Sequence, residues 1–197
     1  MPQQGRSRGS ARERLLRAAD ELFYAQGIAS TGVDAVVGRA EVALASLYKS
    51  FGNKDNLVAA YLAERDRRWR ELWEAEISRA DSAEGRLLAV FDALQVWRET
   101  IGMNHGCAMS AAAVQITDPA HPAVKVITEQ KAWMLRRLGE LAADYGVSAP
   151  AQVAEQLLIT YEGVLARASL GDLAAIDSGR QLAQARLMVE TLVAPRE

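Results

Sequence analysis

Apolar residues recur every three or four positions along almost the whole chain, which is the spacing of one face of an α-helix. Proline and glycine interrupt this pattern between segments, and no strand-like alternation extends over four or more residues. The pattern therefore predicts an all-α protein. Its helices are expected over about residues 10–27, 31–40, 44–51, 54–79, 83–101, 107–117, 123–145, 149–170 and 178–193.

Local capping signals predict where the first helices begin and end. Ser10 and Glu13 have the spacing of a capping box, in which each residue satisfies a free backbone N–H of the helix start. Gly27 is expected to end this first helix. Thr31 and Asp34 have the same capping spacing, so they predict the start of the second helix.

The second and third helices are short and are separated by a break at residues 41–43. Gly52 and Asn53 close the third helix, and Asn53 is expected to cap the long helix that begins near Lys54. Two short helices around a three-residue turn form a helix-turn-helix, whose second helix can enter the major groove of DNA. We therefore expect a basic N-terminal arm (1–9), a DNA-binding domain (10–56) and a larger helical domain (57–197).

The N-terminal arm and the start of the first helix are strongly basic. The first seventeen residues contain five arginines and a single acidic residue, Glu13, although the whole chain has a net charge of −2. Such a segment suits the phosphate backbone of DNA. A solvated, disordered terminus is the alternative interpretation of the same charges.

The segment from Arg12 to Leu57 resembles the DNA-binding region of the tetracycline-repressor (TetR) family of bacterial regulators. The first helix carries the family's Ala-Ala…Leu-Phe…Gly pattern, and a Thr precedes the second helix, as in the family. The family pattern Leu-Tyr-x-x-Phe-x-x-Lys-x-x-Leu follows. The matching residues are Ala18, Ala19, Leu22, Phe23, Gly27, Thr31, Leu47, Tyr48, Phe51, Lys54 and Leu57.

Small or short polar residues at the start of the third helix allow its backbone to approach a duplex, while a phenol and two lysines supply contacts to bases or phosphates. Lys54 also stands at a helix N-terminus, which favours an anion. Arg39 has two interpretations, a phosphate contact or a surface role. The predicted DNA-binding residues are Thr31, Gly32, Arg39, Ala43, Leu44, Ala45, Ser46, Tyr48, Lys49 and Lys54.

Two positions depart from the family pattern. Glu41 occupies the turn position where the family usually has glycine, and a positive φ there would cost about 1 kcal/mol. Leu44 replaces a polar residue, so we expect contact with a thymine methyl in place of a hydrogen bond to a base.

The domain after residue 60 is rich in large aromatic and sulfur-containing side chains. Residues of this kind at helical spacing are usually core, but the family resemblance implies an effector site between these helices. The effector is expected to be a small, largely apolar or aromatic molecule. The predicted ligand-binding residues are Trp69, Trp73, Phe91, Leu94, Trp97, Met109, Trp133, Met134 and Tyr161.

Two apolar stripes near the C-terminus are candidates for a homodimer interface. The family's last two helices form a four-helix bundle with a second subunit, and a dimer would space the reading helices about 34–36 Å apart on a near-palindromic operator. Packing within one subunit would produce the same stripes. The predicted interface residues are Leu157, Leu158, Tyr161, Leu165, Ala185, Met188, Val189 and Leu192.

The resemblance predicts a repressor that an effector releases from double-stranded operator DNA. An enzyme is disfavoured, because no glycine-rich phosphate loop or paired nucleophile and base is evident. A helical adaptor that lost operator reading is the other alternative, suggested by Glu41 and Leu44. We expect no cofactor or metal, since His105 and Cys107 alone lack the ligand count of a metal site.

A cytoplasmic location is expected for the protein. The single cysteine, Cys107, cannot form an internal disulfide, and neither a signal peptide nor a long uncharged apolar run is evident. The sequence identifies neither the effector, the operator nor the regulated genes, and it does not distinguish a repressor from an activator.

Overall fold

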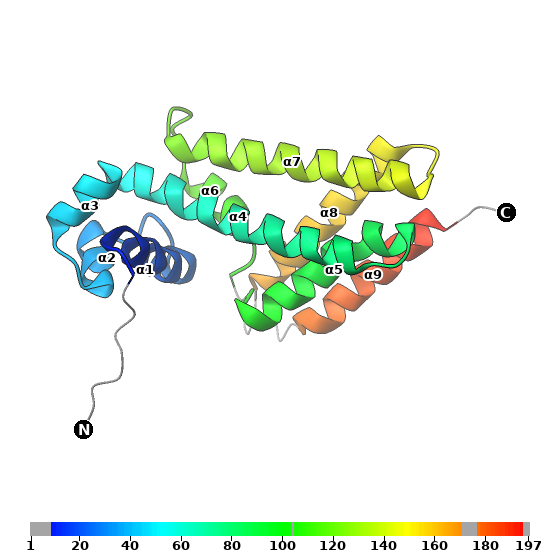
Figure 1. Cartoon of the computed structure of the whole chain (residues 1–197), viewed down its shortest axis with the longest axis horizontal. Helices are drawn as coiled ribbons and strands as arrows, with labels where there is room; N and C mark the ends of the chain where they lie inside the picture. The colour runs from blue at the N-terminus through cyan, green and yellow to red at the C-terminus, as the bar shows by residue number, and fades with distance from the viewer. Residues whose placement is uncertain (1–8, 104, 171–176, 195–197) are drawn as a thin grey trace, which may run out of the picture. The chain divides into compact units, whose positions relative to one another are not determined.

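The computed structural model describes residues 9–103, 105–170 and 177–194. This part of the chain is all-helical, as the apolar periodicity predicted (Figure 1). The helix ends agree with the predicted ones to within a few residues. The helices are α1 (Ala11–Gln26), α2 (Val33–Ala40), α3 (Leu44–Phe51), α4 (Lys54–Arg79), α5 (Ala83–Thr100), α6 (Ala108–Gln115), α7 (Pro122–Tyr145), α8 (Pro150–Ala168) and α9 (Ser178–Val193).

The chain divides into two compact units, and neither is a continuous stretch of sequence. The first comprises Met1–Glu64 and Met109–Ile127, and the second comprises Arg65–Ala108 and Thr128–Glu197. Helices α4 and α7 each belong partly to both units. The first unit therefore contains α6 in addition to the helices of the predicted DNA-binding domain.

Most of the predicted helix boundaries in the first unit rest on local hydrogen bonds. Ser10 and Glu13 form the expected capping box at the start of α1. Gly27 follows α1 with a φ of 89°, a conformation that glycine adopts without strain. The side chain of Asn53 accepts a hydrogen bond from the N–H of Asn56 at 2.8 Å, so it caps α4 as predicted.

The predicted capping of α2 by Thr31 is wrong. The N-cap of α2 is Gly32, and no side chain caps this helix start. The Thr31 side chain is buried, and its hydroxyl donates to the carbonyl of Gly27 at 2.8 Å. Thr31 therefore anchors the loop after α1 in the interior, because its buried hydroxyl is hydrogen-bonded to a backbone carbonyl.

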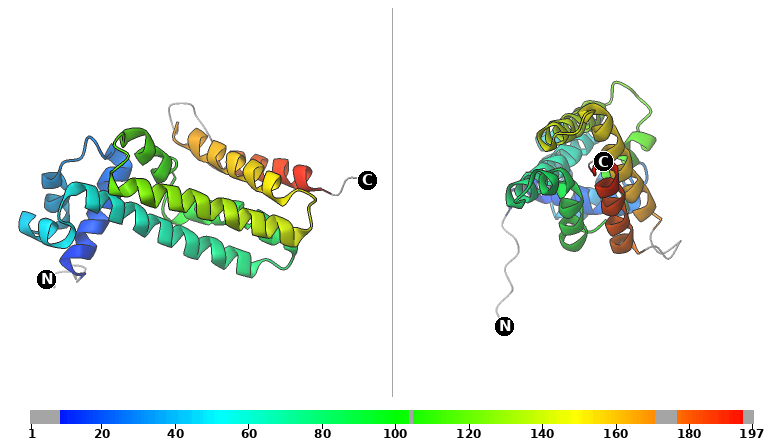
Figure 2. Two further views of the ribbon diagram at one scale, coloured as in Figure 1. Left: turned by 90° about the horizontal axis from the view of Figure 1, so that it is seen from above. Right: turned by 90° about the vertical axis from the view of Figure 1, so that its right-hand side faces the viewer.

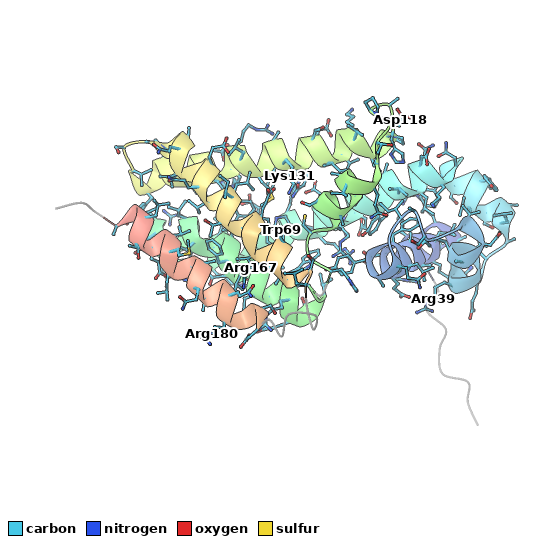
Figure 3. The ribbon with its side chains drawn as sticks, turned by 180° about the vertical axis from the view of Figure 1, so that it is seen from behind. Arg39, Trp69, Asp118, Lys131, Arg167 and Arg180 are labelled. Atoms are coloured by element: carbon cyan, nitrogen blue, oxygen red, sulfur yellow. The ribbon has the colours of Figure 1, made fainter. Side chains whose placement is uncertain are left out.

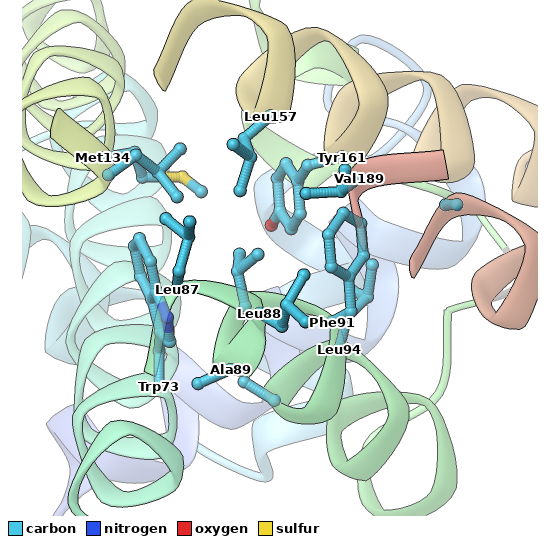
Figure 4. Packing of buried hydrophobic residues seen from close by; sticks show 14 of the residues in the cluster. Trp73, Leu87, Leu88, Ala89, Phe91, Leu94, Met134, Leu157, Tyr161 and Val189 are labelled. Atoms are coloured by element: carbon cyan, nitrogen blue, oxygen red, sulfur yellow. The ribbon is translucent and has the colours of Figure 1, made fainter. Parts of the chain in front are cut away.

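The second unit is built around one apolar core. Helices α5, α8 and α9 contribute to it together with the adjoining parts of α4 and α7, as Figure 4 shows for Trp73, Leu88, Met134, Tyr161 and Val189. The predicted connection between α8 and α9 lies outside the described residues, apart from Asp177. The side chain of Asp177 accepts from the N–H of Arg180 and caps α9.

Helices α4 and α7 lie side by side within the second unit (Figure 2). The guanidinium of Arg137 makes two hydrogen bonds to the carboxylate of Glu74, at 2.8 and 2.9 Å. The guanidinium of Arg70 lies over the ring of Trp133, 4.2 Å from its centroid. These contacts fix the register of the two helices. In the described ranges no helix combines the length and the apolar character that a bilayer crossing needs.

Candidate nucleic-acid interface

The turn between α2 and α3 has the geometry of a helix-turn-helix. Glu41 follows α2 with φ 52° and ψ 49°, which is a left-handed conformation. A positive φ was expected here, because the family usually has glycine at this turn position. Its N–H donates to the carbonyl of Gly38 at 3.2 Å, and the next N–H, from Val42, reaches Val37 at 3.1 Å. The turn thus keeps its shape although a residue with a Cβ occupies the strained position.

A hydrogen bond from α1 stabilises this turn. The guanidinium of Arg14 donates to the carbonyl oxygen of Glu41 at 3.3 Å. Arg14, Arg17 and Arg39 line a hollow of about 310 Å³ with Glu21 and Glu41. Arg39 also forms a 2.6 Å ion pair with Glu21, and both side chains are more than half exposed. Such an exposed pair exchanges readily with another anion, because it contributes little stability.

Helix α3 presents one edge outward because its other edge is apolar and buried. Leu47 and Phe51 lie one turn apart and pack inside the first unit. Leu44 and Tyr48, one turn apart, lie beside this buried face and have 40% and 49% of their surface exposed. The remaining predicted contact residues of this edge are Ala43, Ala45 and Lys49, which are exposed, and Ser46, which is half-buried.

Two predicted DNA contacts are placed differently from what their residue types suggested. Thr31 has no hydroxyl to offer a phosphate, because that group is buried and bonded to Gly27. The ammonium of Lys54 donates to the carbonyl of Ile28 at 2.7 Å and lies over the ring of Phe23. Lys54 therefore stabilises the loop before α2. Gly32, the remaining predicted contact at the α2 start, is exposed.

Helix α6 and the loop after it contact the rest of the first unit through polar groups that the sequence did not indicate. The side-chain oxygen of Gln115 accepts from the N–H of Ala29 at 3.1 Å. After α6, the Nε2 atom of His121 lies 3.4 Å from a carboxylate oxygen of Asp55, while its Nδ1 accepts from the N–H of Ala123. The partners are distant in sequence, so no local spacing pattern could have revealed them.

The predicted effector residues fall mainly into the core of the second unit. Those that belong to this buried cluster are Trp69, Trp73, Phe91, Leu94, Trp97, Met134 and Tyr161, and Trp133 packs against it. Met109 is the exception, because it is buried in the first unit. The rings form contacts at centroid distances of 5.4 to 6.2 Å between Trp69, Trp73, Trp97, Trp133 and Tyr161.

Polar groups that the sequence reasoning missed lie in the same unit. Arg65 and Gln130 are buried, and the Arg65 guanidinium lies over the ring of Trp97. Lys131 forms a 2.6 Å ion pair with Glu162, and its ammonium lies 3.9 Å from the Cys107 sulfur (Figure 3 labels Lys131). Burial raises the pKa of Tyr161 well above its ordinary value, and the nearby Cys107 and Glu162 add to this effect.

The predicted dimer stripe mostly faces the subunit's own core. Five of its members are buried within the second unit: Leu157, Tyr161, Leu165, Ala185 and Val189. Packing within one subunit accounts for these five residues, and their part in a dimer interface stays a prediction. Met188 and Leu192 are exposed, and Leu158 is half-buried.

A groove of about 680 Å³ lies between α8 and α9 on the exposed side. Ile159 and Met188, which are 67% and 65% exposed, line it. Arg167 and Arg180 lie at one end of the two helices and also line this groove (Figure 3). Within the described residues no group of three or more His, Cys, Asp or Glu side chains could hold a metal ion.

Comparisons with known proteins agree with this geometry. The sequence profile of the "Bacterial regulatory proteins, tetR family" matches residues 15–61. The HTH-type transcriptional regulator YjdC of Escherichia coli (strain K12) is 30% identical over 179 residues, which cover 88% of this chain and 91% of that protein. The structure is similar to a TetR-family transcriptional regulator from Streptomyces coelicolor, with a TM-score of 0.84, 31% identity and coverage of 93% of this chain and 94% of the other.

Proposed function

We propose that this chain, which belongs to the TetR family of DNA-binding transcription regulators, is a dimeric repressor that a small, largely apolar or aromatic effector releases from its operator. The exposed edge of α3 is the observation that carries the DNA-binding part of this proposal. A regulator reads bases with a helix whose outer residues are free to enter the major groove. Leu44, Tyr48 and Lys49 offer such an edge, and small alanines flank it.

Each residue of this edge has a distinct part in the proposed complex. Lys49 neutralises a phosphate, and the Tyr48 hydroxyl donates to the backbone or meets a base edge. Leu44 contacts the methyl group of a thymine. Arg39 and Arg14 supply further phosphate contacts beside the turn, because the Arg39–Glu21 pair is exposed. The Lys54 ammonium is excluded from this set, since it already binds the Ile28 carbonyl.

A homodimer provides the second reading helix. We assign the partner to the exposed side of α8 and α9, where Ile159 and Met188 present apolar surface beside the groove. A second copy has the same face, so one two-fold interface would cover both grooves. Two reading helices about 34–36 Å apart would then demand a near-palindromic operator.

Release by effector requires two states that differ in operator affinity. Helix α4 begins in the first unit and ends in the second, so it covalently joins the reading helices to the aromatic core. An effector that binds the released state better by about 2–3 kcal/mol would change operator affinity by tens- to a hundredfold. The adaptor alternative has weaker support, because the relatives are transcriptional regulators and the strained turn at Glu41 is intact.

Operator binding tests this proposal directly. Purified full-length protein should shift DNA from the region upstream of its own gene, and the complex should weaken as salt increases. Replacing Tyr48 and Lys49 together with alanine should abolish the shift and leave the circular dichroism and melting temperature unchanged. Arg79→Ala serves as the control, because it removes an exposed charge from the far end of α4. An unshifted wild-type chain would refute the repressor proposal.

A further inference from the structure

Three polar atoms in the aromatic core of the second unit are buried without a hydrogen-bond partner among the described residues. They are the indole nitrogens of Trp69 and Trp73 and the side-chain oxygen of Gln130. The exposed fractions of these residues are 5%, 0% and 4%. Buried polar groups in folded proteins nearly always have partners, so three unpaired atoms in one core require an explanation.

The unpaired indoles belong to one continuous aromatic wall. Trp69 contacts Trp73 at a ring-centroid distance of 6.2 Å, Trp97 at 5.8 Å and Tyr161 at 5.5 Å. Trp73 in turn meets Trp133 edge to face at 5.4 Å. A ring face is only a weak acceptor for an N–H group, so these contacts leave most of the hydrogen-bonding capacity of the indoles unused.

Gln130 lies at the level of this wall because the register of α4 and α7 places it there. Arg70 stacks on Trp133 and Glu74 binds Arg137, so positions on α7 face positions about 63 residues earlier on α4. By this register Gln130 is level with Arg67 of α4, which is two residues from Trp69 along that helix. Its amide nitrogen has only the thioether sulfur of Met134 as a partner, at 2.9 Å, which leaves the amide oxygen unbound.

The charged side chains near this wall each have at least one partner, although within the described residues the Oδ1 atom of Asp66 and the Nε atom of Arg68 are themselves buried without a hydrogen bond. Lys131 pairs with Glu162 at 2.6 Å, Arg70 pairs with Asp66 at 2.7 Å, and Arg65 lies over Trp97. A charged ligand group in this core would therefore be desolvated without a counter-charge of its own. A ligand that pairs the unpaired atoms instead needs an uncharged hydrogen-bond acceptor facing the indole N–H groups and a hydrogen-bond donor facing the glutamine oxygen.

We infer that the effector is an uncharged aromatic compound carrying a carbonyl acceptor and an adjacent N–H or O–H donor, of which an aromatic amide is the simplest example. Its carbonyl oxygen accepts from the indoles of Trp69 and Trp73, and its donor binds the Oε1 atom of Gln130. This inference rests on the proposed function, because it assigns the chemistry of the effector site of that regulator. The proposed effector is therefore not purely apolar, because it forms hydrogen bonds with two indoles and one side-chain amide.

Three compounds of nearly the same shape test the inference with the full-length protein. Benzamide has the acceptor and the donor, acetophenone has the acceptor alone, and α-methylstyrene has neither. Binding measured by ligand-observed NMR should follow the order benzamide, acetophenone, α-methylstyrene, with about a two- to tenfold loss at each step. Apolar burial alone gives the reverse order, so that order, equal binding of all three, or no binding of any would overturn the inference.

Variants and indole signals identify the groups involved. Gln130→Met should remove the advantage of benzamide over acetophenone, and Trp73→Phe should weaken both carbonyl compounds toward α-methylstyrene. Gln152→Met is the control, because Gln152 is an exposed glutamine of α8 outside this wall. In the wild-type protein, acetophenone should shift the indole N–H resonances of Trp69 and Trp73 downfield, which requires no altered fold. Unshifted resonances at saturation would overturn the assignment.

Operator binding separates this inference from the proposed function. If the ligand order holds but no operator complex forms, the repressor proposal fails and the ligand chemistry stands. If the protein binds its operator but ignores the carbonyl compounds, the regulator stands and the effector assignment fails.

Discussion

The side-chain oxygen of Gln115 accepts a hydrogen bond from the backbone N–H of Ala29, with an N···O distance of 3.1 Å. This bond joins α6 to the loop after α1, and the same oxygen lies 3.2 Å from where a Cβ on Gly27 would be. The glutamine amide nitrogen donates back to Ala111 at 3.0 Å, which fixes the side chain. Helix α6 is therefore tied to the helices that carry the reading edge.

Gln115→Ala should remove this tie and lower the free energy of unfolding by about 0.5–1 kcal/mol, the value of one partly exposed hydrogen bond. Urea unfolding followed by circular dichroism measures the change. Gln152→Ala, an exposed glutamine of α8, should have no effect. Equal stability of the two variants would mean that solvent satisfies Ala29 equally well.

Glu41→Gly should stabilise the protein by about 1 kcal/mol, because glycine adopts a φ of 52° without a Cβ clash. Glu41→Ala removes the same carboxylate but keeps the Cβ, so it should not reproduce the gain. Thermal melting of the two variants distinguishes backbone strain from charge. A gain of the same size in both would show that the carboxylate, and not the conformation, is unfavourable.

Lys54→Met and Lys49→Met should separate a structural lysine from one that binds DNA. The Lys54 variant loses the bond to Ile28 and should be less stable by about 1.5–3 kcal/mol, as for a hydrogen bond to a charged group. The Lys49 variant should keep its stability and reduce the salt dependence of operator binding by about one unit of slope. Denaturant titrations and anisotropy at several salt concentrations test the pair. If Lys54→Met instead kept its stability and lowered the salt dependence of operator binding, Lys54 would belong to the DNA interface.

Tyr161 should make the protein less stable in alkaline solution. Its folded pKa is raised well above 10.0, so above that pH the unfolded chain loses a proton that the folded chain keeps. The stability is therefore unaffected below pH 10 and falls as the pH rises from there towards the folded pKa. Tyr161→Phe should remove a slope of up to about 1.4 kcal/mol per pH unit. An unchanged slope in Tyr161→Phe would contradict the assignment.

Ile159→Glu and Met188→Glu should convert the proposed dimer to monomers, because each places a charge on the exposed side of α8 and α9. Sedimentation velocity of the wild type and variants measures this. Val114→Glu, at a still more exposed apolar position on α6, should remain dimeric. A monomeric wild type, or dimers that tolerate both charges, would place the partner elsewhere or remove it.

The sequence was a reliable guide wherever the relevant partners lie within a turn of one another. The capping box of Ser10 and Glu13, the end of α1 at Gly27 and the bounds of α3 all follow from contacts between near neighbours. The outward edge of α3 was also predictable, since Leu47 and Phe51 define the buried side. Thr31 shows the limit, because its hydroxyl donates to the Gly27 carbonyl before it and does not cap the helix after it.

Periodicity told which faces of α8 and α9 are buried, whereas only the tertiary structure decided what covers them. An apolar stripe has the same spacing whether it packs on its own subunit or on a second one, and Leu157 and Val189 proved to pack on their own. The tie between Gln115 and Ala29, the loop bond of Lys54 and the unpaired indoles likewise depend on folding, because they join or isolate residues that are far apart along the chain.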